Sequence, residues 1–182
     1  MTPPALLVRP STPADLPAIT AIYAEAVLHG TGTFELEPPD QPEMARRRDD
    51  VLAKGLPFLV AQDRGSATGQ VLGYAYANHF RPRRAYRFCL EDSIYLHPAA
   101  RGRGVGKLLL AELLARCEAA GARQMLAVIG DAANAGSIGV HAALGFAHPG
   151  VLKASGWKFD RWLDVVLMQR ALGHGDTAPG GE

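Results

Sequence analysis

Residues 97–107 read His-Pro-Ala-Ala-Arg-Gly-Arg-Gly-Val-Gly-Lys, and they connect an expected strand to a strongly amphipathic expected helix. The first backbone N–H groups of a helix have no partner within it, and they bind phosphate readily. The three glycines of this stretch let the backbone approach a ligand without a Cβ clash, and its two arginines and its lysine add positive charge. The stretch therefore predicts a phosphate-binding turn.

Spacing excludes two other phosphate motifs here. A Walker loop needs a glycine where this chain has Arg101, and a serine or threonine where it has Leu108. A Rossmann fingerprint needs a third glycine where this chain has Leu109. The pattern that remains is Arg-x-x-Gly-x-Gly, at Arg101, Gly104 and Gly106.

Strands and helices alternate along most of the chain. Apolar runs of four to eight residues predict strands, and apolar residues at helical spacing predict helices. The expected helices are 16–30, 42–54, 105–121 and 134–144, and the expected strands are 6–8, 58–61, 71–77, 88–97, 125–129 and those within 147–170, of which 163–168 is the clearest. This order predicts an α/β fold with a mixed sheet, as one domain over residues 1–172. The glycine-rich residues 173–182 are expected to form a disordered tail.

Composition excludes several classes of protein. At 182 residues with 48% hydrophobic residues, the chain is long enough for one globular domain. It contains no run of 18 apolar residues and no N-terminal secretory signal, so we expect a cytoplasmic protein. A net charge of +1 argues against a nucleic-acid module, whose affinity would fall steeply with salt.

Metal binding is not expected. Cys89 and Cys117 are too few for a four-thiolate zinc site or a disulfide framework. The six histidines show no paired ligand spacing.

The Arg-x-x-Gly-x-Gly pattern resembles the pyrophosphate-binding signature of the GNAT N-acetyltransferases. The likeness continues at Asn134, which opens the next helix, and at Gly145-Phe146, which end it. Many members have a tyrosine seven residues after that asparagine. This chain has His141 there, as do the phosphinothricin and methionine sulfoximine acetyltransferases of the superfamily. Further segments that resemble this subfamily are 83–86, Glu91, 93–96, 128–130, 156–158 and 162–165.

The resemblance covers residues 6–172 and implies the GNAT fold, a mixed, mostly antiparallel sheet flanked by helices. It implies an acetyl-CoA-dependent N-acetyltransferase that acts by direct transfer, with no acyl-enzyme and no metal. The implied acceptor is the α-amine of a small amino acid or analogue such as phosphinothricin, methionine sulfoximine or methionine sulfone. The resemblance also implies a homodimer, because close relatives are homodimers. The positions implied for acetyl-CoA are Tyr95, Leu96, Arg101, Gly102, Arg103, Gly104, Val105, Gly106, Lys107, Asn134 and Ser137.

Acetyl transfer to an amine needs a base near the nitrogen, and Glu91 is the first candidate. On a regular strand Glu91 shares a face with Ser93 and Tyr95, whereas a bulge would reverse the parity and make Asp92 the alternative. The competing interpretation of Glu91 is a solvated carboxylate. A backbone N–H near Tyr95 and Leu96 is the expected oxyanion donor.

His141 lies on the apolar stripe of its expected helix, which predicts that it faces inward. Its position coincides with the acid/base site of the family. A histidine there relays a proton from the amine or protonates the leaving thiolate, because its ordinary pKa lies near neutrality. The alternative is a histidine that only packs in the core.

The loop at residues 81–87 carries four arginines, and two of them are expected to bind an anionic or tetrahedral polar group of the substrate. The alternatives are a solvated turn and a short nucleic-acid arm. The positions implied for the substrate are Phe34, Arg81, Arg83, Tyr86, Tyr95, Gly130 and Val165.

Three rival functions remain open from the sequence. An acetyltransferase for polyamines should have an acidic pocket, against which the arginine loop argues. An enzyme for peptide N-termini is the second rival. A non-catalytic acyl-CoA-binding sensor is the third, and it would need neither Glu91 nor His141.

Overall fold

The computed structural model describes residues 6–66 and 69–180 as a sheet with helices on both faces. Its order of elements is the one expected from the sequence. The elements are β1 (Leu6–Pro10), α1 (Leu16–His29), α2 (Gln41–Ala53), β2 (Phe58–Asp63), β3 (Val71–His79), β4 (Cys89–Leu96), α3 (Val105–Ala119), β5 (Gln124–Gly130), α4 (Ala135–Ala143), β6 (Ala147–Lys158) and β7 (Arg161–Ala171), with short 3₁₀ helices at Pro13–Asp15, Arg84–Tyr86 and Pro98–Ala100.

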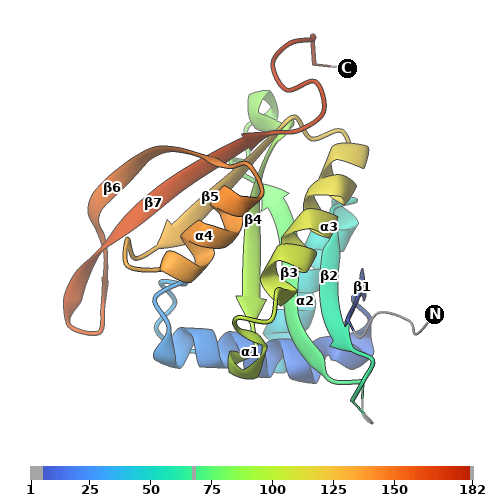
Figure 1. Ribbon diagram of the computed structural model, residues 1–182, viewed down its shortest axis with the longest axis vertical. Coiled ribbons are helices and arrows are strands. Elements are labelled where there is room, and N and C mark those ends of the chain that lie inside the picture. The colour runs from blue at the N-terminus through green and yellow to red at the C-terminus, as the bar shows by residue number, and fades with distance from the viewer. Residues whose placement is uncertain (1–5, 67–68, 181–182) are drawn as a thin grey trace.

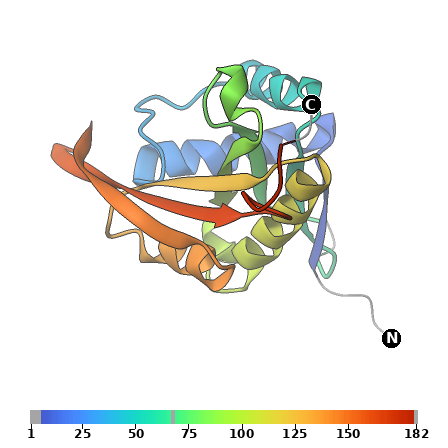
Figure 2. The same ribbon diagram turned by 90° about the horizontal axis from the view of Figure 1, so that it is seen from above.

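The seven strands form one sheet in the order β1-β2-β3-β4-β5-β7-β6. Among the described strands, β4 and β5 pair in parallel, and every other neighbouring pair is antiparallel. The predicted mixed, mostly antiparallel sheet is confirmed. Helices α1 and α2 cover one face of the sheet and α3 and α4 cover the other (Figures 1 and 2).

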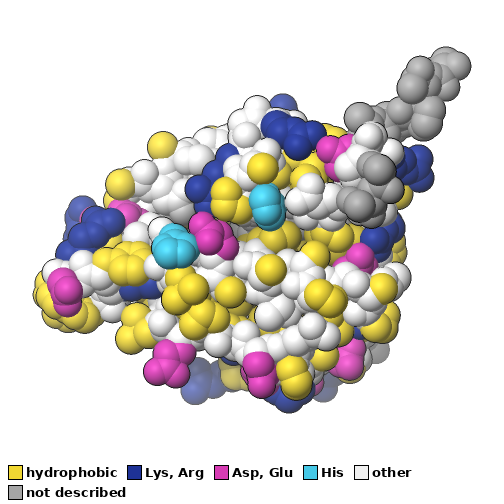
Figure 3. Space-filling view, turned by 90° about the horizontal axis from the view of Figure 1, so that it is seen from below, with side chains coloured by type: hydrophobic (Ala, Val, Ile, Leu, Met, Phe, Trp, Pro, Cys, Tyr) yellow, Lys and Arg dark blue, Asp and Glu magenta, His cyan; other side chains and the backbone are white. Residues whose placement is uncertain are grey.

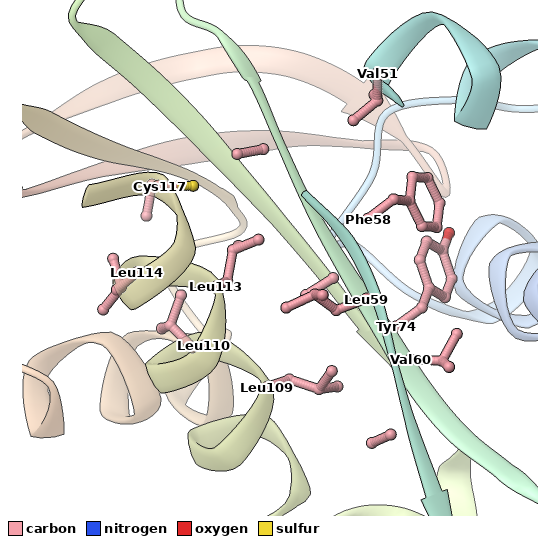
Figure 4. Packing of buried hydrophobic residues seen from close by; sticks show 14 of the residues in the cluster. Val51, Phe58, Leu59, Val60, Tyr74, Leu109, Leu110, Leu113, Leu114 and Cys117 are labelled. Carbon is pink, nitrogen blue, oxygen red and sulfur yellow. The ribbon is translucent and has the colours of Figure 1, made fainter. Parts of the chain in front are cut away.

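The core lies on both sides of the central strands (Figure 4). On one side, Leu109, Leu113 and Cys117 of α3 point toward the sheet and are fully buried. On the other side, the rings of Phe58 and Tyr74 stack with centroids 5.6 Å apart. Each buried side chain of this size stabilises the fold by about 1.5–3 kcal/mol, so this packing holds the central strands firmly in place.

A polar cluster fixes the chain where it enters α1. Asp15 accepts hydrogen bonds from the backbone N–H and the hydroxyl of Thr12, at 2.7 and 3.0 Å. Arg9 donates to both carboxylate oxygens of Asp15 at 2.8 Å. Burial raises the pKa of Asp15, but the bonds from Arg9 and Thr12 outweigh it and leave the pKa below its ordinary value.

Strands β6 and β7 form a long hairpin that projects beyond the helices (Figure 1). Its two turn residues, Phe159 and Asp160, have φ of 52° and 54°. Near the turn, the rings of Trp157 and Trp162 pack edge to face at 5.2 Å and are 53% and 64% exposed. Hydrophobic side chains therefore lie at the end of this projection, and charged side chains lie among them at the left of Figure 3.

Residues 173–180 follow β7 as turns on the protein surface. The Gly175 N–H donates to the Leu172 carbonyl oxygen at 2.9 Å, and Arg123 donates to the Pro179 carbonyl oxygen at 3.0 Å. The last two residues of the expected tail, 181–182, and residues 1–5 of the expected domain lie outside the described residues. The described helices include none that is long and apolar enough to cross a membrane.

Candidate active site

A cleft of about 720 Å³ opens where the two parallel strands separate. Strands β4 and β5 pair from Cys89–Gln124 to Asp92–Ala127. Beyond that point β4 continues to Leu96 and β5 to Gly130, and both continuations line the cleft. The first turns of α3 and α4 and residues 29–34 complete the walls. The separation leaves a strand edge whose backbone groups face the cleft instead of a neighbouring strand.

The register of β4 determines which of its side chains face which helices. Its pairing with β3 is continuous from His79–Leu90 to Gly73–Leu96, so the bulge that the sequence left open is absent from this stretch. Tyr95 faces α1, where its ring lies 4.9 Å from that of Tyr23. Glu91 therefore points to the α1 face, and Asp92 points to the face covered by α3 and α4.

Glu91 is half-buried and lines two cavities. One is the main cleft, and the other is a pocket of about 200 Å³ that it shares with Tyr76, Asn78, His79 and Ser93. Burial raises the pKa of Glu91, the adjacent Asp92 carboxylate raises it further, and Arg81 opposes both effects. A carboxylate with a raised pKa beside a cleft is suited to accept a proton from an amine.

His141 lies on the inner side of α4 and is 1% exposed, which confirms that its stripe faces inward. Nδ1 is 2.7 Å from the carbonyl oxygen of Ser137, and Nε2 is 3.0 Å from Oδ1 of Asp92. The ring of Phe146 packs edge to face against it at 4.9 Å. Burial lowers the pKa of His141, but the Asp92 carboxylate and the Ser137 carbonyl outweigh burial, and the pKa ends above its ordinary value.

Sequence reasoning missed Asp92 as the partner of His141. The two residues are 49 positions apart, and the sequence pattern pointed to Asp92 only as an alternative base. The regular parity of β4 was the available signal, because it places residues 92, 94 and 96 on the face opposite to Glu91.

The glycine-rich turn leads into α3 as expected. Gly104 is the residue before the helix and has φ of 77°, and Gly102 has φ of 72°. Residues other than glycine rarely adopt this left-handed backbone conformation, which explains why both positions are glycine. Arg101, Gly102 and Gly106 line the cleft. The N-terminus of α3 therefore lies at the cleft wall.

Four other positions implied for acetyl-CoA lie outside the cleft lining. Arg103 forms an ion pair with Asp63 at 3.0 Å, and Val105 is buried beneath the helix. Gly104 and Lys107 are exposed. Their role in binding stays a prediction.

The N-terminus of α4 forms the opposite wall. Asn134 caps the helix by accepting a hydrogen bond from the Ser137 N–H at 3.2 Å, and both residues line the cleft. Asp131 precedes the cap with φ of 68°, accepts from the Ala133 N–H at 2.9 Å and pairs with Arg161 at 2.9 Å. Nothing in the sequence pattern pointed to Asp131 or to Arg161 as part of this wall.

The positions implied for the substrate fall into two groups. Phe34, Tyr95 and Gly130 line the cleft. A Cβ on Gly130 would overlap the carbonyl oxygen of Thr31, so glycine is needed there for close packing. The other four lie outside the lining. Three of them are exposed on the 80–88 loop, namely Arg81, Arg83 and Tyr86. The fourth, Val165, is buried beside Gly130 in the sheet.

A polar network holds the loop that carries Phe34. Tyr23 Oη lies 3.0 Å from Thr33 Oγ1 and donates to Glu35 Oε1 at 2.8 Å. Arg47 donates to the same carboxylate at 2.6 Å. Lys158, 3% exposed at the end of β6, donates to the Thr33 carbonyl oxygen at 2.9 Å. The β6–β7 hairpin and two helices thus hold this wall of the cleft in place.

The described residues contain no group of three or more His, Cys, Asp or Glu side chains that could hold a metal ion. Cys89 and Cys117 are both free thiols. Burial and then the Asp92 carboxylate raise the pKa of the Cys117 thiol to about 12.

Comparison with known proteins agrees with this geometry. The model of the acetyltransferase (GNAT) family matches residues 21–146. A phosphinothricin N-acetyltransferase of Alcaligenes faecalis is 58% identical over 163 residues, which are 90% of this chain and 81% of the relative. An L-methionine sulfoximine/L-methionine sulfone acetyltransferase of Pseudomonas aeruginosa is 40% identical over 172 residues, 94% of this chain and 98% of the relative.

A solved structure is also similar over nearly the whole chain. It is the crystal structure of a GNAT superfamily phosphinothricin acetyltransferase from Sinorhizobium meliloti in complex with acetyl-CoA. The two chains share 50% sequence identity with a TM-score of 0.93, and the match covers 98% of this chain and 95% of the other.

Proposed function

Since the chain belongs to the acetyltransferase (GNAT) family and is an N-acetyltransferase, we propose that it acetylates the α-amine of phosphinothricin, methionine sulfoximine or methionine sulfone with acetyl-CoA. The observation that carries the proposal is the cleft between β4 and β5, which joins a glycine-rich helix N-terminus to Glu91 and His141. The likeness to relatives named for these substrates supports the choice of amine.

The cleft walls fit acetyl-CoA. The free N–H groups at the start of α3, with the Arg101 guanidinium, are suited to the pyrophosphate. The separated edges of β4 and β5 offer backbone donors and acceptors to the amide groups of the pantetheine arm. The backbone N–H of Leu96, which points away from β3, is the donor for the thioester oxygen, where charge develops during transfer.

Glu91 and His141 divide the proton transfers. Glu91 accepts a proton from the substrate ammonium group and releases it to solvent, which frees the nitrogen lone pair to attack the thioester carbon. The attack leaves a second proton to be lost from the positively charged nitrogen, and Glu91 accepts this one too as the amide forms. As the carbon–sulfur bond breaks, its electron pair stays on sulfur, and His141 supplies a proton to the thiolate. The amine reaches the thioester directly, so no side chain is acylated.

Substrate selection is assigned to residues on both sides of Glu91. Phe34, Tyr95 and Gly130 shape the cleft next to the reacting atoms. Arg81, Arg83 and Tyr86 lie on the loop that joins β3 to β4, and Arg81 is close enough to Glu91 to oppose the rise of its pKa. This loop is placed to bind the carboxylate or the tetrahedral group of a substrate whose amine reaches Glu91. Val165 supports Gly130 from the neighbouring strand.

We assign the chain to a homodimer as part of the same proposal. The exposed rings of Trp157, Phe159 and Trp162 at the end of the hairpin support it, because side chains of this kind are enriched at interfaces. Sedimentation equilibrium should give twice the 19.4 kDa of one chain, and a monomer at micromolar concentration would contradict it.

The test is release of free thiol from acetyl-CoA across a panel of amines. The panel contains the three named substrates, plain amino acids, a polyamine and a short peptide. Saturable turnover with kcat/KM highest for the named substrates is the expected result. Turnover confined to the peptide or the polyamine would refute the substrate assignment, and tight acetyl-CoA binding without any turnover would favour the sensor.

A further inference from the structure

The contact between Asp92 and His141 joins two ionisable groups in a nearly dry site. Their side chains are 3% and 1% exposed, and Asp92 Oδ1 lies 3.0 Å from His141 Nε2. The other ring nitrogen, Nδ1, lies 2.7 Å from the carbonyl oxygen of Ser137. A carbonyl oxygen only accepts hydrogen bonds, so Nδ1 carries a hydrogen. A carboxylate also only accepts, so an ionised Asp92 requires a second hydrogen on Nε2.

Among the described groups around Asp92, His141 is the one that can supply a positive charge to balance the Asp92 carboxylate. Asp92 Oδ2 is buried and has no hydrogen-bond partner among the described residues. From α3, Cys117 faces Asp92 as a neutral thiol, since its pKa is about 12. On the other side of β4, Glu91 adds a further negative group. From β7, Arg170 donates to the Leu144 carbonyl oxygen at the end of α4 and is engaged there.

We propose that Asp92 is a positioning residue that keeps His141 as an imidazolium before the reaction, and so makes His141 the acid for the leaving thiolate. The assignment rests on the proposed acetyl transfer. It also separates the two candidate roles of His141. With both ring nitrogens already donating, His141 offers no lone pair to an incoming amine, and the base must be another group, for which Glu91 is placed.

The protons balance in this scheme. When the carbon–sulfur bond breaks, its electrons stay on sulfur. The Nε2–H of His141, which donates to Asp92 Oδ1 before the reaction, then gives its proton to that sulfur instead. His141 becomes a neutral imidazole that keeps its Nδ1 hydrogen on the Ser137 carbonyl oxygen. The substrate nitrogen loses two protons on its way from ammonium to amide. Glu91 accepts the first before the attack and releases it to solvent, and it accepts the second as the amide forms. The buried Asp92 carboxylate is then unpaired, which favours return of a proton from solvent to His141 before the next turnover.

The protonation of His141 is consistent with this assignment. Burial alone lowers the pKa of an imidazole, yet the Asp92 and Ser137 contacts leave the pKa of His141 above its ordinary value. Replacing the Asp92 carboxylate by an amide keeps the shape and removes the charge. Burial then dominates, and the amide N–H of the new side chain can donate to a neutral Nε2.

The first experiment needs no turnover. The ¹⁵N NMR shifts of the histidine side chains are followed against pH in the free protein, with His141→Gln used to assign the His141 signals. We expect both nitrogens of His141 to be protonated at pH 7, and Asp92→Asn to reduce its proton affinity at least tenfold. A neutral His141 at pH 7 in the unmodified protein would overturn the proposal, even if the Asp92→Asn variant does not fold.

The second experiment follows kcat against pH. An acid must be protonated, so kcat falls as pH rises through the pKa of His141. Asp92→Asn should move this fall at least one pH unit lower and reduce kcat at pH 8 at least tenfold, with acetyl-CoA affinity unchanged. The matched control is Asp50→Asn, an exposed carboxylate on α2, which should leave the profile in place. An unmoved profile in active Asp92→Asn enzyme refutes the role of Asp92 while the acetyl transfer stands. If no amine is acetylated, the proposed function fails and the NMR result still decides the pairing.

Discussion

The glycine before α3 is the most direct structural test of the phosphate-binding turn. Gly104 has φ of 77°, and a Cβ built on it meets no heavy atom within 4 Å. Gly104→Ala therefore adds no steric clash, and its effect is the cost of a left-handed backbone, about 1–2 kcal/mol. The turn either keeps its shape, which lowers the free energy of unfolding, or relaxes, which redirects the first N–H groups of α3.

The two responses are measured separately. Urea unfolding should show a loss of about 1–2 kcal/mol if the turn is retained. Calorimetric titration should show a loss of about 5–30-fold in acetyl-CoA affinity if the turn relaxes, because each 1.4 kcal/mol is a factor of ten. Gly139→Ala is the matched control. This glycine is in α4, outside the cleft lining and with open space around its Cβ position, so alanine should stabilise the helix by about 0.5–1 kcal/mol. Unchanged stability together with unchanged affinity in Gly104→Ala would refute the reasoning.

Three further predictions concern Glu91, Lys158 and Asp15. Glu91→Gln should lower kcat/KM by about 10²–10⁴-fold while calorimetry gives the same acetyl-CoA affinity, and undiminished turnover would remove Glu91 from the mechanism. Lys158→Met should leave the Thr33 carbonyl oxygen without its buried donor, at a cost of about 1–3 kcal/mol. Amide hydrogen exchange in residues 31–35 should then become about 5–150-fold faster. Equal exchange rates in the variant and the unmodified protein would contradict this role of Lys158. The folded pKa of Asp15 is lowered, so its carboxylate stabilises the fold above its ordinary pKa, and the contribution disappears as pH falls through the folded value. Asp15→Asn should therefore reduce the free energy of unfolding by about 1.5–3 kcal/mol at pH 7 and by little at pH 2, and an equal reduction at both pH values would exclude the charge as the cause.

The order of elements could be predicted because the apolar residues of each long element recur with a clear period, or because a glycine marks its end. Gly30 follows α1 directly, Gly104 directly precedes α3, and the buried residues of α3 recur at helical spacing from Val105 to Cys117. The β6–β7 hairpin could not be delimited in this way. Its turn is Phe159-Asp160 at positive φ, where Asn-Gly or Asp-Gly is the usual signal. A register shift between Leu152 and Gly156 further interrupts the alternation on which strand prediction depends.

The site could be predicted in part. The Arg-x-x-Gly-x-Gly pattern located the α3 end of the cleft from local sequence alone, since a helix N-terminus and its glycines are neighbours in the chain. The positions of Glu91 and His141 came from family resemblance, and their chemistry depends on contacts across the sheet. The Asp92–His141 pair and the Lys158–Thr33 bond join residues 49 and 125 positions apart. The hydrophobic periodicity of a single helix or strand carries no information about such long-range contacts.

The central claim is transfer of an acetyl group to the α-amine of these amino-acid analogues. The measurement that tests it most directly is the yield of N-acetyl product, quantified by mass spectrometry against the CoA released from acetyl-CoA. We predict one N-acetylphosphinothricin or N-acetylmethionine sulfone for each CoA, with saturation in both substrates. Absence of N-acetylated product from all three analogues, with acetyl-CoA bound tightly, would contradict the account.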